Sequence, residues 1–146
     1  MNTDIENAQI EAKKRFLSRF CSNELEIERV EQEIEMWESR AQRITVDLSP
    51  YVDGGERCDR IQDATGELVE LRALLYEKLT DSTTLRLEIE HSIANMKDER
   101  LRLLLELRYI DGLTWEKVAE KLNTEYRWVL RLHKRALNEL KIPDWI

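Results

Sequence analysis

Two short helical patterns joined by a tight turn occupy residues 114–140, and no other stretch constrains the fold of this chain as closely. The positions that would face inward are all apolar or small: Val118, Ala119, Leu122, Val129, Leu132 and Ala136. On each side of the turn they repeat with the period of an α-helix. Asn123 ends the first pattern, where the backbone usually becomes left-handed, a conformation that asparagine tolerates better than most residues. The combined spacing predicts a helix-turn-helix motif.

The charge distribution distinguishes the two ends of the chain. The whole chain carries a net charge of −7. From residue 94 onward there are eleven Lys/Arg and nine Asp/Glu, a balance of +2, which leaves −9 for residues 1–93. Residues 126–141 hold five basic side chains against Glu139 alone, a local balance of +4. This asymmetry predicts a basic DNA-binding element on an acidic body, and the alternative is an ordinary solvated helix face.

The composition favours an all-α protein. Among 146 residues, 36% are charged and only four are glycine and two proline, as in long exposed helices. We expect no secretory signal and no membrane segment, because the N-terminus is polar and no run of roughly 18 apolar residues occurs. Cys21 and Cys58 lack metal-ligand spacing, so we expect reduced thiols and no metal or cofactor.

The N-terminal part predicts a long antiparallel helical hairpin of coiled-coil character. Thr3 to Glu6 fits a capping box, and no glycine or proline interrupts the pattern before Pro50. A helix is therefore expected over residues 4–48, with a heptad stripe from Ile27 to Leu48. A loop over residues 49–57 would lead to a second helix ending near Thr80. Its stripe is Ile61, Ala64, Leu68, Leu71, Leu75 and Leu79, with Leu74 beside it.

Two such helices bury little surface, so we expect a further helix or a second copy of the chain, with a dimer favoured. The expected domains are residues 1–80, an acidic hairpin for oligomerisation or partner binding, and residues 81–146, a DNA-binding domain. The latter would begin with a helix over residues 81–96. Asp98 would cap the next helix, which ends at Asp111-Gly112, and Thr114 would cap the first helix of the motif.

Helix periodicity selects the residues that would meet DNA. With the inner stripe buried, Arg127 and Arg131 share an exposed face of the second motif helix, one turn apart. Guanidinium groups match the edge of guanine in the major groove, so these two residues are the predicted base contacts. Residues suited to contacts with the phosphate backbone are Thr114, Lys117, Lys121, Lys134 and Arg135.

Residues 101–141 resemble region 4 of sigma-70-type factors. The resemblance rests on LELRY at 105–109, TWEKVAEKL at 114–122 and RLHKRALNEL at 131–140. Within that group the string RWVLRLHKRAL at 127–137 is similar to phage late-gene regulators of the ArpU/RinA type. The resemblance implies a phage or prophage regulator that binds promoter DNA in the cytoplasm of a bacterial host. Carried over by position, it implies groove-facing sites at Tyr126, Arg127, Leu130 and Arg131, although Leu130 stands where sigma factors usually have a polar residue.

Other functions remain open at this stage. We expect no enzymatic activity, because His91 and His133 lie on helical patterns and no nucleophile or Gly-rich phosphate loop accompanies them. One alternative is a helical adaptor whose C-terminal module binds RNA polymerase or another protein. A second alternative is a phage DNA-packaging component, since such proteins also join helix-turn-helix modules to helical oligomerisation segments.

Overall fold

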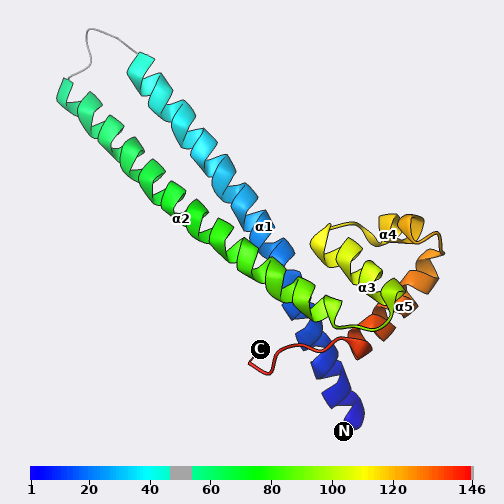
Figure 1. The fold of residues 1–146 in the computed structure, drawn as a ribbon. Helices are drawn as coiled ribbons and strands as arrows, with labels where there is room; N and C mark the ends of the chain where they lie inside the picture. The colour runs from blue at the N-terminus through cyan, green and yellow to red at the C-terminus, as the bar shows by residue number, and fades with distance from the viewer. Residues whose placement is uncertain (47–53, 146) are drawn as a thin grey trace. The chain divides into compact units, whose positions relative to one another are not determined.

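The computed structural model describes residues 1–46 and 54–145, and in these residues the fold is all-α without strands (Figure 1). The elements are α1 (Asn2–Val46), α2 (Gly54–Ala94), α3 (Glu99–Leu105), a π-helical turn η1 (Glu106–Ile110), α4 (Trp115–Lys121) and α5 (Tyr126–Glu139). None of these helices is long and apolar enough to cross a membrane. The chain divides into two compact units, residues 23–81 and residues 1–22 with 82–146.

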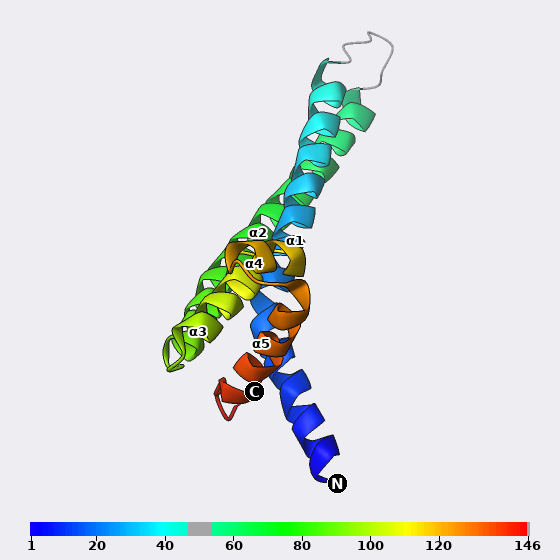
Figure 2. The same cartoon turned by 90° about the vertical axis from the view of Figure 1, so that its right-hand side faces the viewer.

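The first unit is an antiparallel pair formed by parts of α1 and α2, as expected (Figure 1). Its apolar contacts come from the predicted stripes, and the buried residues are Val30, Ile34, Leu68 and Leu71, with Trp37 and Leu75 packed against them. Polar contacts also join the two helices. The Asn23 amide donates a hydrogen bond of 2.8 Å to the Lys78 carbonyl, and Arg72 lies 3.0 Å from Glu38. Within this unit, the predicted stripes of the two helices therefore pack against each other, and the helices run side by side in both views (Figure 1 and Figure 2).

Several predicted boundaries in this region were wrong. A single helix α2 continues through Thr80 to Ala94, because the inner stripe keeps its period through Ser82 and Ile89, which are both buried. The helix already begins at Gly54, within the expected loop of residues 49–57; the rest of that loop, residues 49–53, lies outside the described residues. Leu79 is exposed and does not belong to the inner stripe. At the other end, α1 begins at Asn2, so Thr3 lies inside the helix and is not its cap.

The second unit has one apolar core that includes the start of α1. Phe16 and Leu17 are fully buried there, together with Leu101, Leu104 and Leu105 of α3. Hydrogen bonds also tie α1 to the C-terminal part of the chain. The Lys13 ammonium donates to the Leu137 carbonyl at 2.8 Å, and the Cys21 thiol donates to the Tyr109 carbonyl at 3.1 Å.

Residues 1–22 therefore pack with the C-terminal part, whereas we expected all of residues 1–80 to form the hairpin domain. The physical reason is that α1 carries two successive apolar stripes. The stripe around Phe16 and Leu17 has its partners in residues 82–146, and the stripe from Ile27 onward has its partners in α2. Periodicity shows that a helix face is buried but does not show what buries it.

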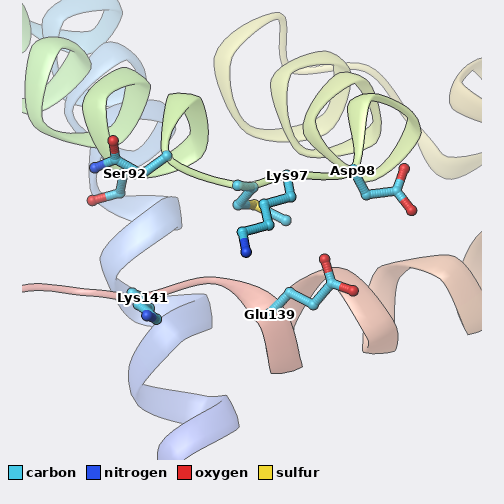
Figure 3. A pocket seen from close by; sticks show the side chains of 7 residues that line it. Ser92, Lys97, Asp98, Glu139 and Lys141 are labelled. Atoms are coloured by element: carbon cyan, nitrogen blue, oxygen red, sulfur yellow. The ribbon is translucent and has the colours of Figure 1, made fainter.

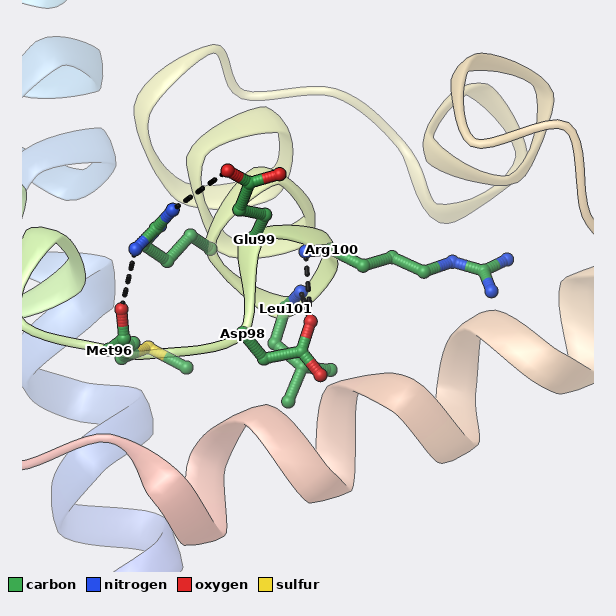
Figure 4. Close-up of polar contacts among 6 residues, drawn as sticks. Met96, Asp98, Glu99, Arg100 and Leu101 are labelled. Carbon is green, nitrogen blue, oxygen red and sulfur yellow. Dashed lines mark hydrogen bonds and ion pairs between the residues drawn. The ribbon is translucent and has the colours of Figure 1, made fainter.

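The junction between α2 and α3 is held by polar contacts (Figure 4). The Asp98 carboxylate accepts hydrogen bonds from the backbone N–H groups of Arg100, at 2.9 Å, and Leu101, at 3.4 Å. This confirms the predicted cap of α3. Arg102 donates to the Met96 carbonyl at 2.7 Å and lies 3.8 Å from the Glu99 carboxylate. Hydrogen bonds to Asp98 and Met96 thus fix the start of α3 to the turn that precedes it.

Candidate nucleic-acid interface

Hydrogen bonds fix both the start of α4 and the turn between α4 and α5. The hydroxyl of Thr114 accepts a hydrogen bond from the Lys117 N–H at 3.3 Å and so caps α4 as predicted. After α4, Asn123 has a φ of +53°, which confirms the predicted left-handed residue. Its N–H donates to the Glu120 carbonyl at 3.1 Å, and the Thr124 N–H donates to the Ala119 carbonyl at 3.0 Å. This is the Schellman pattern of helix termination, which gives the turn one defined geometry.

The inward faces of α4 and α5 fix the rotation of both helices. Val118, Val129 and Ala136 have no exposed surface, Ala119 and Leu132 are also buried, and Leu122 is partly buried. These residues join the core formed by Leu101, Leu104 and Leu105. Because 3.6 residues make one turn, burying this stripe turns the opposite face of α5 to solvent. The side chains on that face are therefore positioned by the aliphatic core.

The predicted base-contacting residues all lie on the exposed side of α5. Arg127 and Arg131 are exposed, and Tyr126 and Leu130 expose 45% and 40% of their surface. In the part of the chain that the structure describes, no carboxylate forms an ion pair with either arginine. The Arg131 guanidinium lies 5.9 Å from the ring centroid of Trp128, a residue that is 42% exposed. Both arginines thus keep their donors available to an external acceptor.

The predicted backbone-contacting residues lie around this face. Lys117 and Lys121 are exposed on α4, and Lys134 and Arg135 are exposed on α5. Among residues 1–46 and 54–145, none of these four forms an ion pair. Thr114 is exposed too, but its hydroxyl oxygen already caps α4. Four unpaired cations on two adjacent helices are suited to contact a phosphate backbone.

The start of α5 lacks one usual element. Glu125 occupies the N-cap position with extended backbone angles, and its side chain makes no capping hydrogen bond. The carbonyl of Glu125 instead accepts hydrogen bonds from the N–H groups of Trp128 and Val129. The helix therefore starts without the stabilising hydroxyl that a Ser or Thr would supply.

One buried polar contact on the inner side of α5 was not predicted from the sequence. The Tyr109 hydroxyl lies 2.7 Å from Nε2 of His133, and the Trp115 ring centroid lies 4.4 Å from that of His133. Burial lowers the pKa of His133 to about 4, assisted by the positive charges of Lys14 and Arg108. Burial likewise raises the pKa of Tyr109 to about 12. His133 is therefore neutral at pH 7, and the tautomer of its ring decides which of the two groups donates the hydrogen bond. The sequence held a signal for this position, because His133 follows Val129 by four residues on the edge of the inner stripe.

Two of the cavities in this unit are lined by charged side chains of both signs. One of about 700 Å³ lies between the end of α2 and the end of α5 (Figure 3). Its lining combines Lys97 and Lys141 with Asp98 and Glu139, so the charges balance. The other, of about 320 Å³, lies between α1 and α5 and is lined in part by Glu11, Lys14 and Lys134. In the described residues, no group of three His, Cys, Asp or Glu side chains could hold a metal ion.

Comparison with protein families gives one match. Residues 98–141 match the model described as Sigma-70, region 4. The matched segment begins at Asp98, the cap of α3, and ends just after α5, so it coincides with the helices that build the motif. It covers less than half of the chain and says nothing about residues 1–97. Neither the curated proteins nor the solved structures gave a match. Region 4 is a DNA-binding helix-turn-helix module, and the match therefore supports DNA binding and transcription regulation by the C-terminal helices.

Proposed function

We propose that this chain is a sequence-specific DNA-binding regulator of transcription that acts in a bacterial host, and that it controls late genes of a phage or prophage. It would act without a cofactor and without catalysing a reaction. The observation that carries the DNA-binding part is the exposed pair Arg127 and Arg131, on a helix whose rotation is fixed by its core. Neither arginine forms an ion pair with any residue that the structure describes. The late-gene role depends on the resemblance of residues 127–137 to the ArpU/RinA type.

In this proposal, α5 enters the major groove and α4 crosses the backbone. Arg127 and Arg131 read guanine edges, and Tyr126 and Leu130 contact neighbouring bases. Lys117, Lys121, Lys134 and Arg135 bind phosphates and set the register. One such module binds DNA weakly, so a dimer that occupies two half-sites would supply the missing affinity.

The test is DNA binding by fluorescence anisotropy at several salt concentrations, after the bound sites have been mapped on the host phage genome. We compare the wild-type chain with Arg127→Ala/Arg131→Ala. The matched control, Arg29→Ala/Arg60→Ala, removes two exposed arginines from the hairpin instead. We expect the first variant to lose at least about 2 kcal/mol of specific binding free energy and the control to lose almost none. Equal binding by all three proteins would rule out the groove contact.

A second candidate is the adaptor that binds RNA polymerase. It is favoured by the three exposed apolar and aromatic side chains Tyr126, Trp128 and Leu130 on α5, because such residues are enriched at protein interfaces. If the chain binds purified polymerase and that binding is lost in Trp128→Ala, while no DNA site is found, the adaptor is the correct function.

A further inference from the structure

One face of α2 within the hairpin unit carries a second helical stripe. Its members follow one another at steps of four and three: Gln62, Gly66, Val69, Ala73, Tyr76 and Thr80. We call these six residues the outer seam. All six are exposed, and Val69 and Tyr76 expose 61% and 75% of their surface. The outer seam lies on the side of α2 away from Leu68 and Leu71, which are buried against α1.

The outer seam contains no charged residue, although 36% of the residues in this chain are charged. An exposed helix face in such a chain usually carries lysine, arginine and glutamate. Steps of four and three over three heptads are the pattern by which one helix packs along another. The Thr80 hydroxyl is compatible with such packing, because it donates to the Tyr76 carbonyl of α2 itself, at 3.0 Å.

Gly66 gives an independent indication. Glycine weakens a helix interior, and it is retained where another backbone must come close. In this structure, no atom within 4 Å would meet a Cβ placed on Gly66. Packing within the unit therefore gives no reason for a glycine here. Together with Ala73, one heptad further along the seam, Gly66 leaves room for a second helix to approach closely.

The charges beside the outer seam indicate which helix fits. One flank is acidic and consists of Asp63, Glu70 and Glu77; the other consists of Thr65, Arg72 and Leu79. If two copies of α2 lie parallel and in register, the flanks of one copy face the opposite flanks of the other. Arg72, which lies 3.0 Å from Glu38 of its own chain, then also comes near the partner's Glu77. If they lie antiparallel, the two acidic flanks face each other and repel. The exposed face of α1 in a second copy would also repel the acidic flank of α2, because that face carries Glu24, Glu28, Glu31 and Glu35.

We propose that the outer seam of α2 binds the same seam of a second copy of this chain, with the two helices parallel and in register. This inference depends on the proposed self-association and specifies its surface and orientation. A parallel pair has a two-fold axis along the helices, which is the symmetry that a regulator needs to present two modules to two half-sites.

Sedimentation equilibrium of the full chain without DNA tests the interface. We expect a concentration-dependent species of twice the chain mass of 17.4 kDa. Val69→Glu or Tyr76→Glu should weaken dimerisation by at least about tenfold, since each would place a carboxylate inside the interface. Leu25→Glu is the matched control, because Leu25 is 64% exposed on α1, and it should leave the dimer unchanged. Circular dichroism of each variant verifies that the helices are intact.

Orientation is tested by cross-linking in a Cys58→Ser background, because Cys58 is exposed on the same helix. Gln62→Cys and Tyr76→Cys are made separately and oxidised. In a parallel pair both positions lie opposite themselves, and both proteins should form covalent dimers. In an antiparallel pair at most one of them can lie on the two-fold axis. Cross-linking at only one position would overturn the orientation.

The flanking charges provide a second test. In a Glu38→Ala background, which removes the internal partner of Arg72, Arg72→Glu and Glu77→Arg should each weaken the dimer, and the double exchange should restore it. A chain that stays monomeric at all concentrations, or that dimerises equally well with Val69→Glu, would overturn the proposed interface and indicate another partner for the seam. Because no DNA is present, these results do not depend on whether the chain binds DNA.

Discussion

The hydroxyl of Tyr109 and Nε2 of His133 lie 2.7 Å apart and connect η1 to the inner edge of α5. His133 stands in the same helix as Arg127 and Arg131, and it is held between this hydrogen bond and the ring of Trp115. The contact therefore connects α5, which carries the proposed base contacts, to η1. Burial keeps His133 neutral at pH 7, because it lowers the pKa of this histidine to about 4.

The lowered pKa of His133 predicts a loss of stability in acid. The pKa of His133 is about 4 in the folded chain and about 6.5 when the histidine is unfolded. As the pH falls, the unfolded chain takes up the proton first, which favours unfolding. The contribution of His133 is thus complete above pH 6.5 and is lost between pH 6.5 and 4. We expect the difference in unfolding free energy between wild type and His133→Gln to shrink by about 2 to 3 kcal/mol across this range.

The measurement is urea denaturation of both proteins at pH 7.5, 6, 5 and 4. Taking the difference between the two proteins cancels the titration of the carboxylates, which affects both alike. Tyr109→Phe is a useful companion, because it keeps the titrating histidine and removes only its hydrogen-bond partner. If the difference between wild type and His133→Gln does not change with pH, then His133 does not titrate as its burial requires.

The turn between α4 and α5 gives a second prediction. Asn123 has a φ of +53°, which costs a β-branched residue more than it costs asparagine or glycine. Asn123→Val should therefore destabilise the chain by about 1 to 2 kcal/mol, whereas Asn123→Gly should change its stability by less than about 0.5 kcal/mol. Thermal and urea unfolding measure both. Equal stability of the two variants would mean that the turn can form without a left-handed residue.

The contact between α1 and the C-terminal helices gives a third prediction. Leu17 has no exposed surface and belongs to the core beneath α5. Leu17→Ala should destabilise this unit by about 2 to 5 kcal/mol and weaken DNA binding at temperatures near unfolding. Ile5→Ala, on the same helix but at a residue that is 59% exposed, is the matched control and should have little effect. If both variants unfold like the wild type, residues 1–22 do not contribute to this core.

The helix-turn-helix could be predicted from the sequence because its determinants are local. The cap at Thr114, the left-handed Asn123 and the buried Val129 each follow from properties of one residue and its neighbours, and the structure bears out these features. The same holds for the cap at Asp98 and for the antiparallel hairpin, whose two stripes share one period.

Other contacts between distant residues could not be predicted. Phe16 and Leu17 are buried, and only the structure shows that they belong to the core of residues 82–146. We also expected the second helix to end near Thr80, and Thr80, Asp81 and Ser82 do have low helix propensity. Burial of Ser82 and Ile89 along the same stripe outweighs that propensity, and α2 continues. The bond between Tyr109 and His133 joins positions in two elements, and no short-range pattern reports it.

Separate roles for the basic residues of α5 give the last prediction. In the proposed complex, Arg127 would read bases, whereas Lys134, nearly two turns later, would bind a phosphate. Lys134→Ala should weaken binding to specific and random duplexes alike and reduce the slope of log K against log salt by about 1, from a wild-type value near −4. Arg127→Ala should instead reduce the preference for the specific site by about 1 to 3 kcal/mol.

The control for both is Lys97→Ala. It removes one exposed positive charge from the same unit, at the cavity beside the end of α5, and should leave the slope unchanged. If Lys97→Ala lowers the slope as much as Lys134→Ala does, binding reflects the total charge of the unit and not a surface centred on α5. If Arg127→Ala weakens binding to all duplexes equally, Arg127 contacts the backbone, and sequence discrimination has to come from Arg131 and its neighbours.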